Sequence, residues 1–251
     1  MKAMILAAGL GTRLRPLTDN LPKALVEING RTLLEITITR LKSFGVKELI
    51  INVHHYAEKI VAYLKSRQSF DLQIAISRED DLLLDTGGGL KKAGWFFLEG
   101  DANEPFILHN VDVLSSVDLG RMASFHKEEG ALATLAVQNR ATSRYLVFDE
   151  RLQLCSRLTS ADPIITPVTE FAGSSQHARA LAFSGIHIIS PRLLSLMTER
   201  GVFSIIESYL RLAAAGERVL AFRADEYYWR DLGRLEDLKQ AESDYRNRLI
   251  S

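Results

Sequence analysis

The residues with the clearest chemical potential lie within the first 25 positions, where a loop of small residues precedes basic side chains. Residues 7–12 read Ala-Ala-Gly-Leu-Gly-Thr and follow an apolar run, so a ligand can reach the N–H groups of their uncovered backbone. Such a turn forms an anion-binding nest. Arg13, Arg15 and Lys23 add positive charge where a polyphosphate would lie. We therefore predict that the loop binds a nucleotide through Ala7, Ala8, Gly9, Gly11 and Thr12.

The spacing of these residues separates the loop from two other phosphate-binding turns. A P-loop has two glycines five apart followed by Lys-Ser/Thr, and the sequence contains no such run. A dinucleotide-binding fingerprint has a third glycine three residues after the second, where this chain has Leu14. The next predicted strand ends in Asn52-Val53-His54 rather than an acidic ribose ligand, which argues further against an NAD(P)-dependent oxidoreductase. An ordinary strand-to-helix turn would not need the added arginines, proline and lysine.

An aspartate stands where it could hold a metal ion. Asp112 comes directly after a predicted strand at 105–108, and ligands of parallel sheets bind outside the carboxyl ends of the strands. A lone carboxylate there suits Mg²⁺, which takes one or two protein carboxylates and draws its other ligands from phosphates and water. The alternative is that Asp112 caps the next helix. We disfavour it because Ser115 and Ser116 are better placed as caps.

A second glycine cluster, residues 85–89 with the sequence Asp-Thr-Gly-Gly-Gly, lies between a predicted strand and a predicted helix. Three consecutive glycines are costly to order because each loses more backbone entropy than any other residue. We therefore expect a planar ligand to pack on this bare backbone, with a flexible surface loop as the alternative. His54 and His55 have no partner at metal-ligand spacing, so we interpret them as ordinary strand-end residues.

Taken in order along the chain, these motifs resemble the sugar-1-phosphate nucleotidylyltransferases. The resemblance rests on residues 6–16, Leu-Ala-Ala-Gly-Leu-Gly-Thr-Arg-Leu-Arg-Pro, with Pro22-Lys23, and on residues 229–233, Trp-Arg-Asp-Leu-Gly, which are similar to that family's late Trp-x-Asp-x-Gly element. It implies a Mg²⁺-assisted reaction in which an NTP and a sugar 1-phosphate give an NDP-sugar and pyrophosphate by in-line attack. The single-domain length most resembles the N-acetylmuramate-phosphate uridylyltransferase and mannose- or heptose-phosphate guanylyltransferase branches.

The resemblance also implies roles for individual residues. The phosphate cradle would be Gly9, Gly11 and Thr12. The catalytic residues would be Arg13 on the leaving pyrophosphate, Lys23 on the α-phosphate or the sugar phosphate, and Asp112, which with Asp231 would hold Mg²⁺. Further nucleotide contacts would come from Asn52, Glu79, Thr86, Gly87 and Gly88, and substrate contacts from Asn110, Glu170, Ser184 and Gly185. Charge neutralisation and positioning would then supply the catalysis.

The sugar side departs from the family pattern. Glu170 has no lysine beside it, so Arg157 or Arg179 would have to take the role of that lysine. Val111 also stands where family members usually carry Gly or Ala. Two other functions stay open: a nucleotidylyltransferase acting on phosphocholine or another non-sugar phosphate, and a non-catalytic regulatory protein that binds nucleotide sugars.

The composition of the chain limits its class and its partners. The 251 residues are 47% hydrophobic, which suits one large α/β domain. Lys+Arg and Asp+Glu are both 31, so no overall field favours nucleic acid or an anionic membrane. Cys155 is the one cysteine, which excludes a disulfide framework. Without a recognisable leader or spanning segment, we expect a cytoplasmic monomer or homodimer that binds an NTP and a sugar 1-phosphate.

The elements that would position these residues alternate between strand and helix through the first half, which predicts a parallel sheet with crossover helices. We expect an α/β, Rossmann-like, doubly wound and mainly parallel sheet with a small β-rich sugar-binding portion. Residues 1–251 would form one domain, with a nucleotide-binding half at 1–138 and a sugar-phosphate half at 139–251. Strands are predicted at 4–6, 48–53, 72–77, 105–108, 131–137 and 219–222, with further strands within 144–190. Helices are predicted around 34–41 and at 56–66, 90–97, 122–129, 191–199, 204–214 and 234–247.

Overall fold

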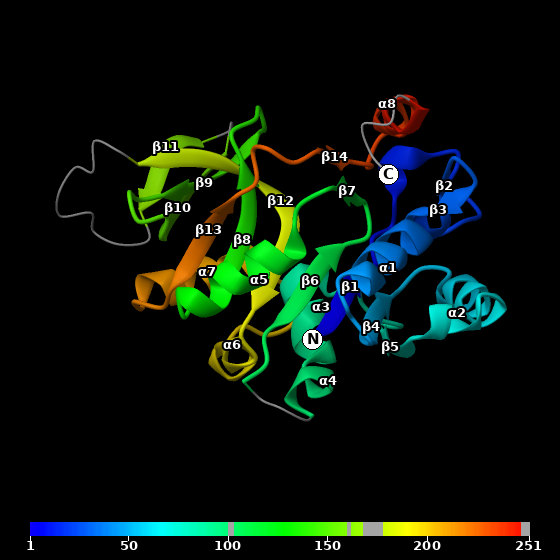
Figure 1. Cartoon of the computed structure of the whole chain (residues 1–251), viewed down its shortest axis with the longest axis horizontal. Coiled ribbons are helices and arrows are strands. Elements are labelled where there is room, and N and C mark those ends of the chain that lie inside the picture. The colour runs from blue at the N-terminus through cyan, green and yellow to red at the C-terminus, as the bar shows by residue number, and fades with distance from the viewer. Residues whose placement is uncertain (100–102, 160–161, 168–177, 247–251) are drawn as a thin grey trace.

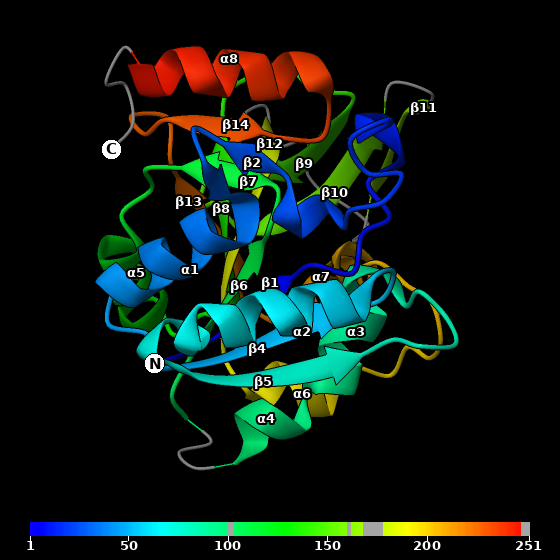
Figure 2. The same cartoon turned by 90° about the vertical axis from the view of Figure 1, so that its right-hand side faces the viewer.

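A computed structural model describes residues 1–99, 103–159, 162–167 and 178–246. Within these ranges the chain forms a mixed sheet of ten strands with helices on both faces (Figure 1). The view turned by 90° shows the last helix lying beside a short strand at one end of the molecule (Figure 2). The α/β class and the mainly parallel central sheet predicted from the sequence are confirmed.

The first half of the chain supplies the parallel part of the sheet. Its strands are β1 (Lys2–Leu6), β4 (Glu48–Val53), β5 (Gln73–Arg78) and β6 (Phe106–Asn110), in the spatial order β6-β1-β4-β5. In this register Leu6 is the partner of both Asn52 and Asn110. The carboxyl ends of three strands therefore meet at one edge of the sheet.

The second half adds strands that are mostly antiparallel. They are β8 (Ala133–Gln138), β9 (Arg144–Phe148), β10 (Leu154–Thr159), β11 (Asp162–Pro167), β12 (Arg179–Ile189) and β13 (Val219–Arg223). The long strand β12 pairs antiparallel with β6, β8 and β9, whereas β13 pairs parallel with β8. Because β12 contacts both halves, it joins the antiparallel strands to the parallel ones in a continuous sheet.

Eight helices and several short elements complete the described chain. The helices are α1 (Leu33–Ser43), α2 (Ala57–Ser66), α3 (Asp85–Ala93), α4 (Trp95–Leu98), α5 (Leu119–Glu128), α6 (Arg192–Leu196), α7 (Ile205–Ala214) and α8 (Leu235–Arg246). The short strands are β2 (Glu27–Ile28), β3 (Arg31–Thr32), β7 (Val113–Ser115) and β14 (Trp229–Asp231). The 3-10 turns are η1 (Thr12–Leu14), η2 (Lys23–Leu25) and η3 (Gln68–Asp71). The helix predicted at 90–97 differs most from the structure. The observed helix α3 begins earlier, at Asp85, because the glycine cluster is part of it.

The core consists of two apolar layers, one on each face of the sheet. Ala3 and Ile5 of β1 belong to the layer that contains the buried residues of α1, α2 and α5, whereas Met4 belongs to the layer formed with α3, α4 and α7. All three side chains are fully buried. Covering both faces explains why the parallel strands appear in the sequence as continuous apolar runs rather than as alternating patterns.

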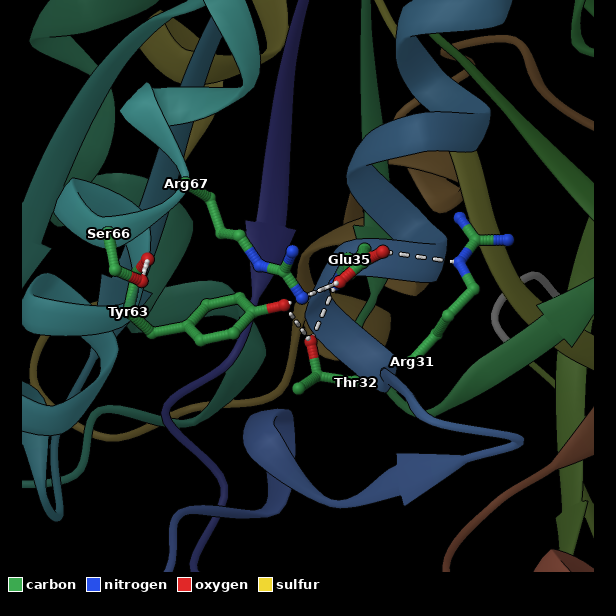
Figure 3. Close-up of polar contacts among 6 residues, drawn as sticks. All are labelled: Arg31, Thr32, Glu35, Tyr63, Ser66 and Arg67. Atoms are coloured by element: carbon green, nitrogen blue, oxygen red, sulfur yellow. Dashed lines mark hydrogen bonds and ion pairs between the residues drawn. The ribbon is translucent and has the colours of Figure 1, made fainter.

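A polar cluster fixes the first two helices to each other (Figure 3). The Thr32 hydroxyl caps α1 by accepting a hydrogen bond from the Glu35 N–H at 3.0 Å, as Ser or Thr caps commonly do. The Glu35 carboxylate then accepts from the Tyr63 hydroxyl of α2 at 2.6 Å and pairs with Arg67 at 3.1 Å. This cluster therefore ties α1 to α2 on the face of the sheet that they cover.

The cap of α5 differs from the one that the sequence suggested. Asp118 caps this helix, accepting a hydrogen bond from the Arg121 N–H at 2.9 Å. Ser115 and Ser116, predicted as caps, instead bind the backbone of Tyr228, with a donor at 3.0 Å and an acceptor at 2.9 Å. The two serines thus stabilise the pairing of β7 with β14. Because Asp118 caps α5, Asp112 is not needed as a cap. Among the described residues, no helix is long and apolar enough to cross a membrane.

The buried His126 gives a testable link between pH and stability. Its ring contacts the Thr134 hydroxyl at 2.9 Å and the Ser190 hydroxyl at 3.0 Å, and burial lowers its pKa from 6.5 to about 4. The unfolded chain binds a proton at His126 below about pH 6.5, whereas the folded chain does not. The free energy of unfolding should therefore fall by up to about 2 kcal/mol from this residue alone between pH 6.5 and about pH 5.

Urea unfolding at both pH values checks this effect. We expect His126→Gln to show a smaller drop than the wild type, while His55→Gln, which changes an exposed ring, keeps the wild-type drop. Equal drops in the wild type and His126→Gln would show that His126 titrates normally in the folded chain.

Candidate active site

The first loop begins where β1 ends, at the shared edge of the parallel strands. Gly11 opens the turn η1 with φ +67°, and its carbonyl accepts a hydrogen bond from the Thr18 hydroxyl at 2.8 Å. A Cβ on Gly11 would lie 3.0 Å from side-chain atoms of both Lys23 and Thr18, so conformation and space both favour glycine. A Cβ on Gly9 would meet no atom within 4 Å. The loop is thus tight at Gly11 and open at Gly9.

Two buried polar side chains hold the start of this loop in place. The Asn52 amide oxygen accepts a hydrogen bond from the Ala7 N–H at 2.7 Å, and its amide nitrogen donates to Glu79 at 2.7 Å. The second Glu79 oxygen accepts from the Leu84 N–H at 2.8 Å. Asn52 and Glu79 are 2% and 1% exposed. Their hydrogen bonds therefore join β1, β4 and β5 to the segment before α3, and any contact of theirs with a nucleobase stays a prediction.

The two aspartates are brought together by the short strands β7 and β14. These strands pair antiparallel with Asp231 opposite Val113, and the Leu232 N–H donates to the Asp112 carbonyl at 2.8 Å. The Asp231 carboxylate accepts from the Gly233 N–H at 2.9 Å. Two aspartates far apart in the sequence thus form one carboxylate pair.

Four charged side chains lie close enough here to act on one another. Burial raises the pKa of Asp231, and the charge of Asp112 raises it further, whereas Lys23 and Arg13 lower it. The Lys23 ammonium, on a side chain 8% exposed, contacts the Asp112 carboxylate directly. A Cβ on Gly233 would lie 2.7 Å from an Arg13 guanidinium nitrogen and 2.5 Å from an Asp231 oxygen, so only glycine leaves room for both side chains.

A cavity of about 500 Å³ lies against these groups. Its lining contains ten of the residues predicted from the sequence, namely Ala8, Gly9, Gly11, Thr12, Arg13, Lys23, Asn52, Thr86, Asn110 and Asp112. The side chains of Leu10, Leu83 and Val202 add apolar surface. The described cavity therefore combines backbone N–H groups, cations, a carboxylate and an apolar wall.

The glycine cluster lies in the first turns of α3, and protein atoms cover it. The N–H groups of Gly87 and Gly88 both donate to the Phe203 carbonyl, at 3.0 and 3.3 Å. A Cβ on Gly87 would lie 2.4 Å from the Phe203 ring, and one on Gly88 would lie 2.5 Å from the Gly201 carbonyl oxygen. These glycines allow the segment before α7 to pack on α3, and the members of the cluster that reach the cavity are Asp85 and Thr86.

This packing predicts a loss of stability in Gly87→Ala. The added methyl overlaps the Phe203 ring, which should lower the free energy of unfolding by about 1–3 kcal/mol, more than the helix propensity of alanine returns. Gly9→Ala is the matched control, because open space at Gly9 should keep its stability within about 0.5 kcal/mol of the wild type. Urea unfolding compares the variants, and equal stability of the two would contradict the packing role.

Of the predicted sugar-side residues, Asn110 lines the cavity, whereas Ser184 and Gly185 do not. Gly185 has φ +73° at a register shift of β12 against β8, and a Cβ there would lie 2.9 Å from the Asn110 amide nitrogen. Ser184 is fully buried, and its carbonyl accepts from the Trp229 indole N–H at 2.8 Å. The bulge at Gly185 therefore brings β12 against Asn110. Glu170 lies outside the described residues.

The structure adds one functional candidate that the sequence motifs do not include, Arg140. Its guanidinium carbon lies 3.4 Å from the centre of the Trp229 ring, and its Nη2 donates to the Phe183 carbonyl at 2.8 Å. Burial lowers the pKa of Arg140, while the charge of Asp231 raises it. The sequence does contain a signal for Arg140, because this residue closely follows the apolar run 131–137, just as Asp112 follows the strand before it. Arg157 and Arg179, which the sequence predicts in the role of the missing sugar-side lysine, are exposed.

Comparison with known proteins matches residues 2–248 to the nucleotidyl transferase family. An N-acetylmuramate alpha-1-phosphate uridylyltransferase from Caulobacter vibrioides is 34% identical over 92% of this chain and 91% of its own length. A UTP–glucose-1-phosphate uridylyltransferase from Synechocystis is 31% identical over 96% of this chain, which spans 62% of that relative. A solved structure of a putative glucose-1-phosphate thymidylyltransferase from Bacillus anthracis, 16% identical, covers all of this chain and 97% of its own with a TM-score of 0.80.

Proposed function

Because this chain belongs to the nucleotidyl transferase family, we propose that it transfers a nucleotidyl group from an NTP to a sugar 1-phosphate and releases pyrophosphate. The observation that carries this proposal is the convergence of Arg13, Lys23 and Asp112 on a cavity that the nest loop also lines, with Asp231 close enough to feel their charges. The two relatives named from their sequences are uridylyltransferases of N-acetylmuramate 1-phosphate and of glucose 1-phosphate, which supports a sugar phosphate as the acceptor.

The chain's own residues supply positioning and charge for this reaction. The acceptor oxygen of a sugar phosphate is already an anion, so in-line attack on the α-phosphorus needs no general base. The N–H groups of Gly9, Gly11 and Thr12 would bind the phosphates, as the open backbone at Gly9 allows. Arg13 would stabilise the charge that develops on the leaving pyrophosphate, and Lys23 would bind the α-phosphate or the sugar phosphate.

The carboxylate pair fits a divalent cation. Two partly buried carboxylates repel each other, and the raised pKa of Asp231 records both the burial and that repulsion. The described residues hold no group of three or more metal-ligating side chains, and Mg²⁺ needs only one or two carboxylates besides phosphate and water. We propose that Asp112 and Asp231 hold Mg²⁺, which would neutralise phosphate charge and orient the substrates when bound.

The two substrates are assigned to the two halves of the chain, which also form the two parts of the sheet. We propose that residues 1–138 bind the nucleotide and that residues 139–251 bind the sugar phosphate, because the nest loop and Asp112 belong to the first half and the Gly185 bulge to the second. The reaction consumes a nucleoside triphosphate, so the cytoplasm is the compartment that we propose for it.

Pyrophosphate release from a panel of substrates tests this function. We expect release with at least one combination of UTP, GTP, CTP or dTTP with glucose, mannose or N-acetylmuramate 1-phosphate, in the presence of Mg²⁺. Asp112→Asn should lower kcat/KM by about 100-fold or more, because it removes a charge at the reacting phosphates. Phosphocholine in the same panel separates a non-sugar acceptor from a sugar.

The matched control is Asp118→Asn, which changes a carboxylate at the start of α5 that only caps the helix. Asparagine caps as well as aspartate, so this variant should keep wild-type turnover and stability. Tight nucleotide-sugar binding without turnover in the wild type would instead support a regulatory protein, and wild-type turnover in Asp112→Asn would refute the assigned role.

A further inference from the structure

We propose that Arg140 binds the phosphate group of the sugar 1-phosphate, the role that the family resemblance gives to a lysine that this sequence lacks beside Glu170. This inference rests on the proposed function, since it assigns the acceptor side of the same site. The juxtaposition that carries it is a guanidinium held between the Gly185 bulge and the strand of Asp231.

The topology places Arg140 at the correct edge of the sheet. Strand β8 runs antiparallel to β12, and β12 runs antiparallel to β6, so β8 and β6 point the same way. Arg140 follows the carboxyl end of β8 just as Asp112 follows that of β6. Both residues therefore leave the sheet at the edge where ligands of such sheets bind.

Two contacts fix the guanidinium there, and a third fixes the ring on which it stacks. Its Nη2 donates to the Phe183 carbonyl at 2.8 Å, and its planar face stacks on the Trp229 ring at 3.4 Å. The Trp229 indole in turn donates to the Ser184 carbonyl, next to Gly185. A stacked and hydrogen-bonded guanidinium loses little further entropy when it binds an anion, because its orientation is already set.

The hydrogen bonds that Arg140 makes within the described residues do not satisfy all of its donors. Its Nε is buried without a hydrogen-bond partner, which costs free energy, and the carboxylate that acts on it electrostatically is Asp231. A sugar phosphate that approaches Asp112 and Asp231 carries the same sign of charge as they do, so it needs a cation on its own side. Arg13 belongs to the first loop and lies near Gly233, and it is the residue assigned to the leaving pyrophosphate.

Phosphate is the anion that suits this group. A guanidinium presents parallel N–H donors that match two phosphate oxygens, and such charge-assisted pairs are stronger than neutral hydrogen bonds. The alternative is that Arg140 only supports Trp229, and through it the strand of Asp231. Under that alternative, loss of Arg140 would disturb metal and nucleotide binding as much as acceptor binding.

Steady-state kinetics with both substrates varied separate the two roles. The probes are UTP or GTP with glucose, mannose or N-acetylmuramate 1-phosphate. We expect Arg140→Gln to raise KM for the sugar phosphate by about 10- to 100-fold while KM for the NTP changes by less than about twofold. Arg140→Lys should raise KM for the sugar phosphate less than Arg140→Gln does, since lysine keeps the positive charge but lacks the paired N–H donors of the guanidinium. Arg151→Gln, an exposed arginine in the β9–β10 turn, should match the wild type in every constant.

An unchanged KM for the sugar phosphate in Arg140→Gln, or equal increases in both KM values, would overturn the inference. Absence of turnover in the wild type would instead count against the proposed function. In that case, calorimetric titration with the same three sugar phosphates decides the question. Binding by the wild type and Arg151→Gln that is lost in Arg140→Gln upholds the inference, whereas binding by all three proteins, or by none, overturns it.

Discussion

The site depends on one short antiparallel pairing, in which three residues of β7 meet three of β14. This pairing sets Asp231 opposite Val113 and lets the Leu232 N–H bind the Asp112 carbonyl. The Ser115 hydroxyl donates to the Tyr228 carbonyl and the Ser116 hydroxyl accepts from the Tyr228 N–H, which fixes the register of the pair. Since side chains alternate between faces along a strand, a slip of one residue would turn Asp231 away from Asp112. The two serines are therefore as important to the site as the aspartates that they align.

The second constraint is electrostatic. Burying two carboxylates side by side is unfavourable, as the raised pKa of Asp231 shows, and the chain balances it with the Lys23 ammonium and the Arg13 guanidinium. Burial strengthens every interaction among these groups because the local dielectric is low. A site of this kind holds charges of both signs in fixed positions before any substrate arrives. Such preorganisation suits phosphoryl chemistry, in which the protein stabilises charge rather than forming covalent bonds.

Local features of the fold and site were predictable from the sequence, whereas long-range ones were not. The strand at 48–53 and the loop through Gly11 follow from apolar runs and small residues, which act over a few positions. The meeting of Asp112 with Asp231 depends on the three-residue strand β14, which is too short to leave a periodic signal. The glycines of α3 suggested a ligand because the Phe203 ring that covers them is far away in sequence. Arg140 follows an apolar run, which is a weak signal in the sequence, whereas its stacking on Trp229 is evident only in three dimensions.

The most direct test of the account is a double-mutant cycle on Asp112→Asn and Asp231→Asn, measured as kcat/KM for pyrophosphate release with the best substrate pair. Residues that act as one unit lose most of their effect with the first substitution. We predict that the double variant is little worse than the more impaired single variant, with a coupling energy of at least about 1 kcal/mol. Additive effects within about 0.5 kcal/mol would show that the two carboxylates act independently, and would contradict the account.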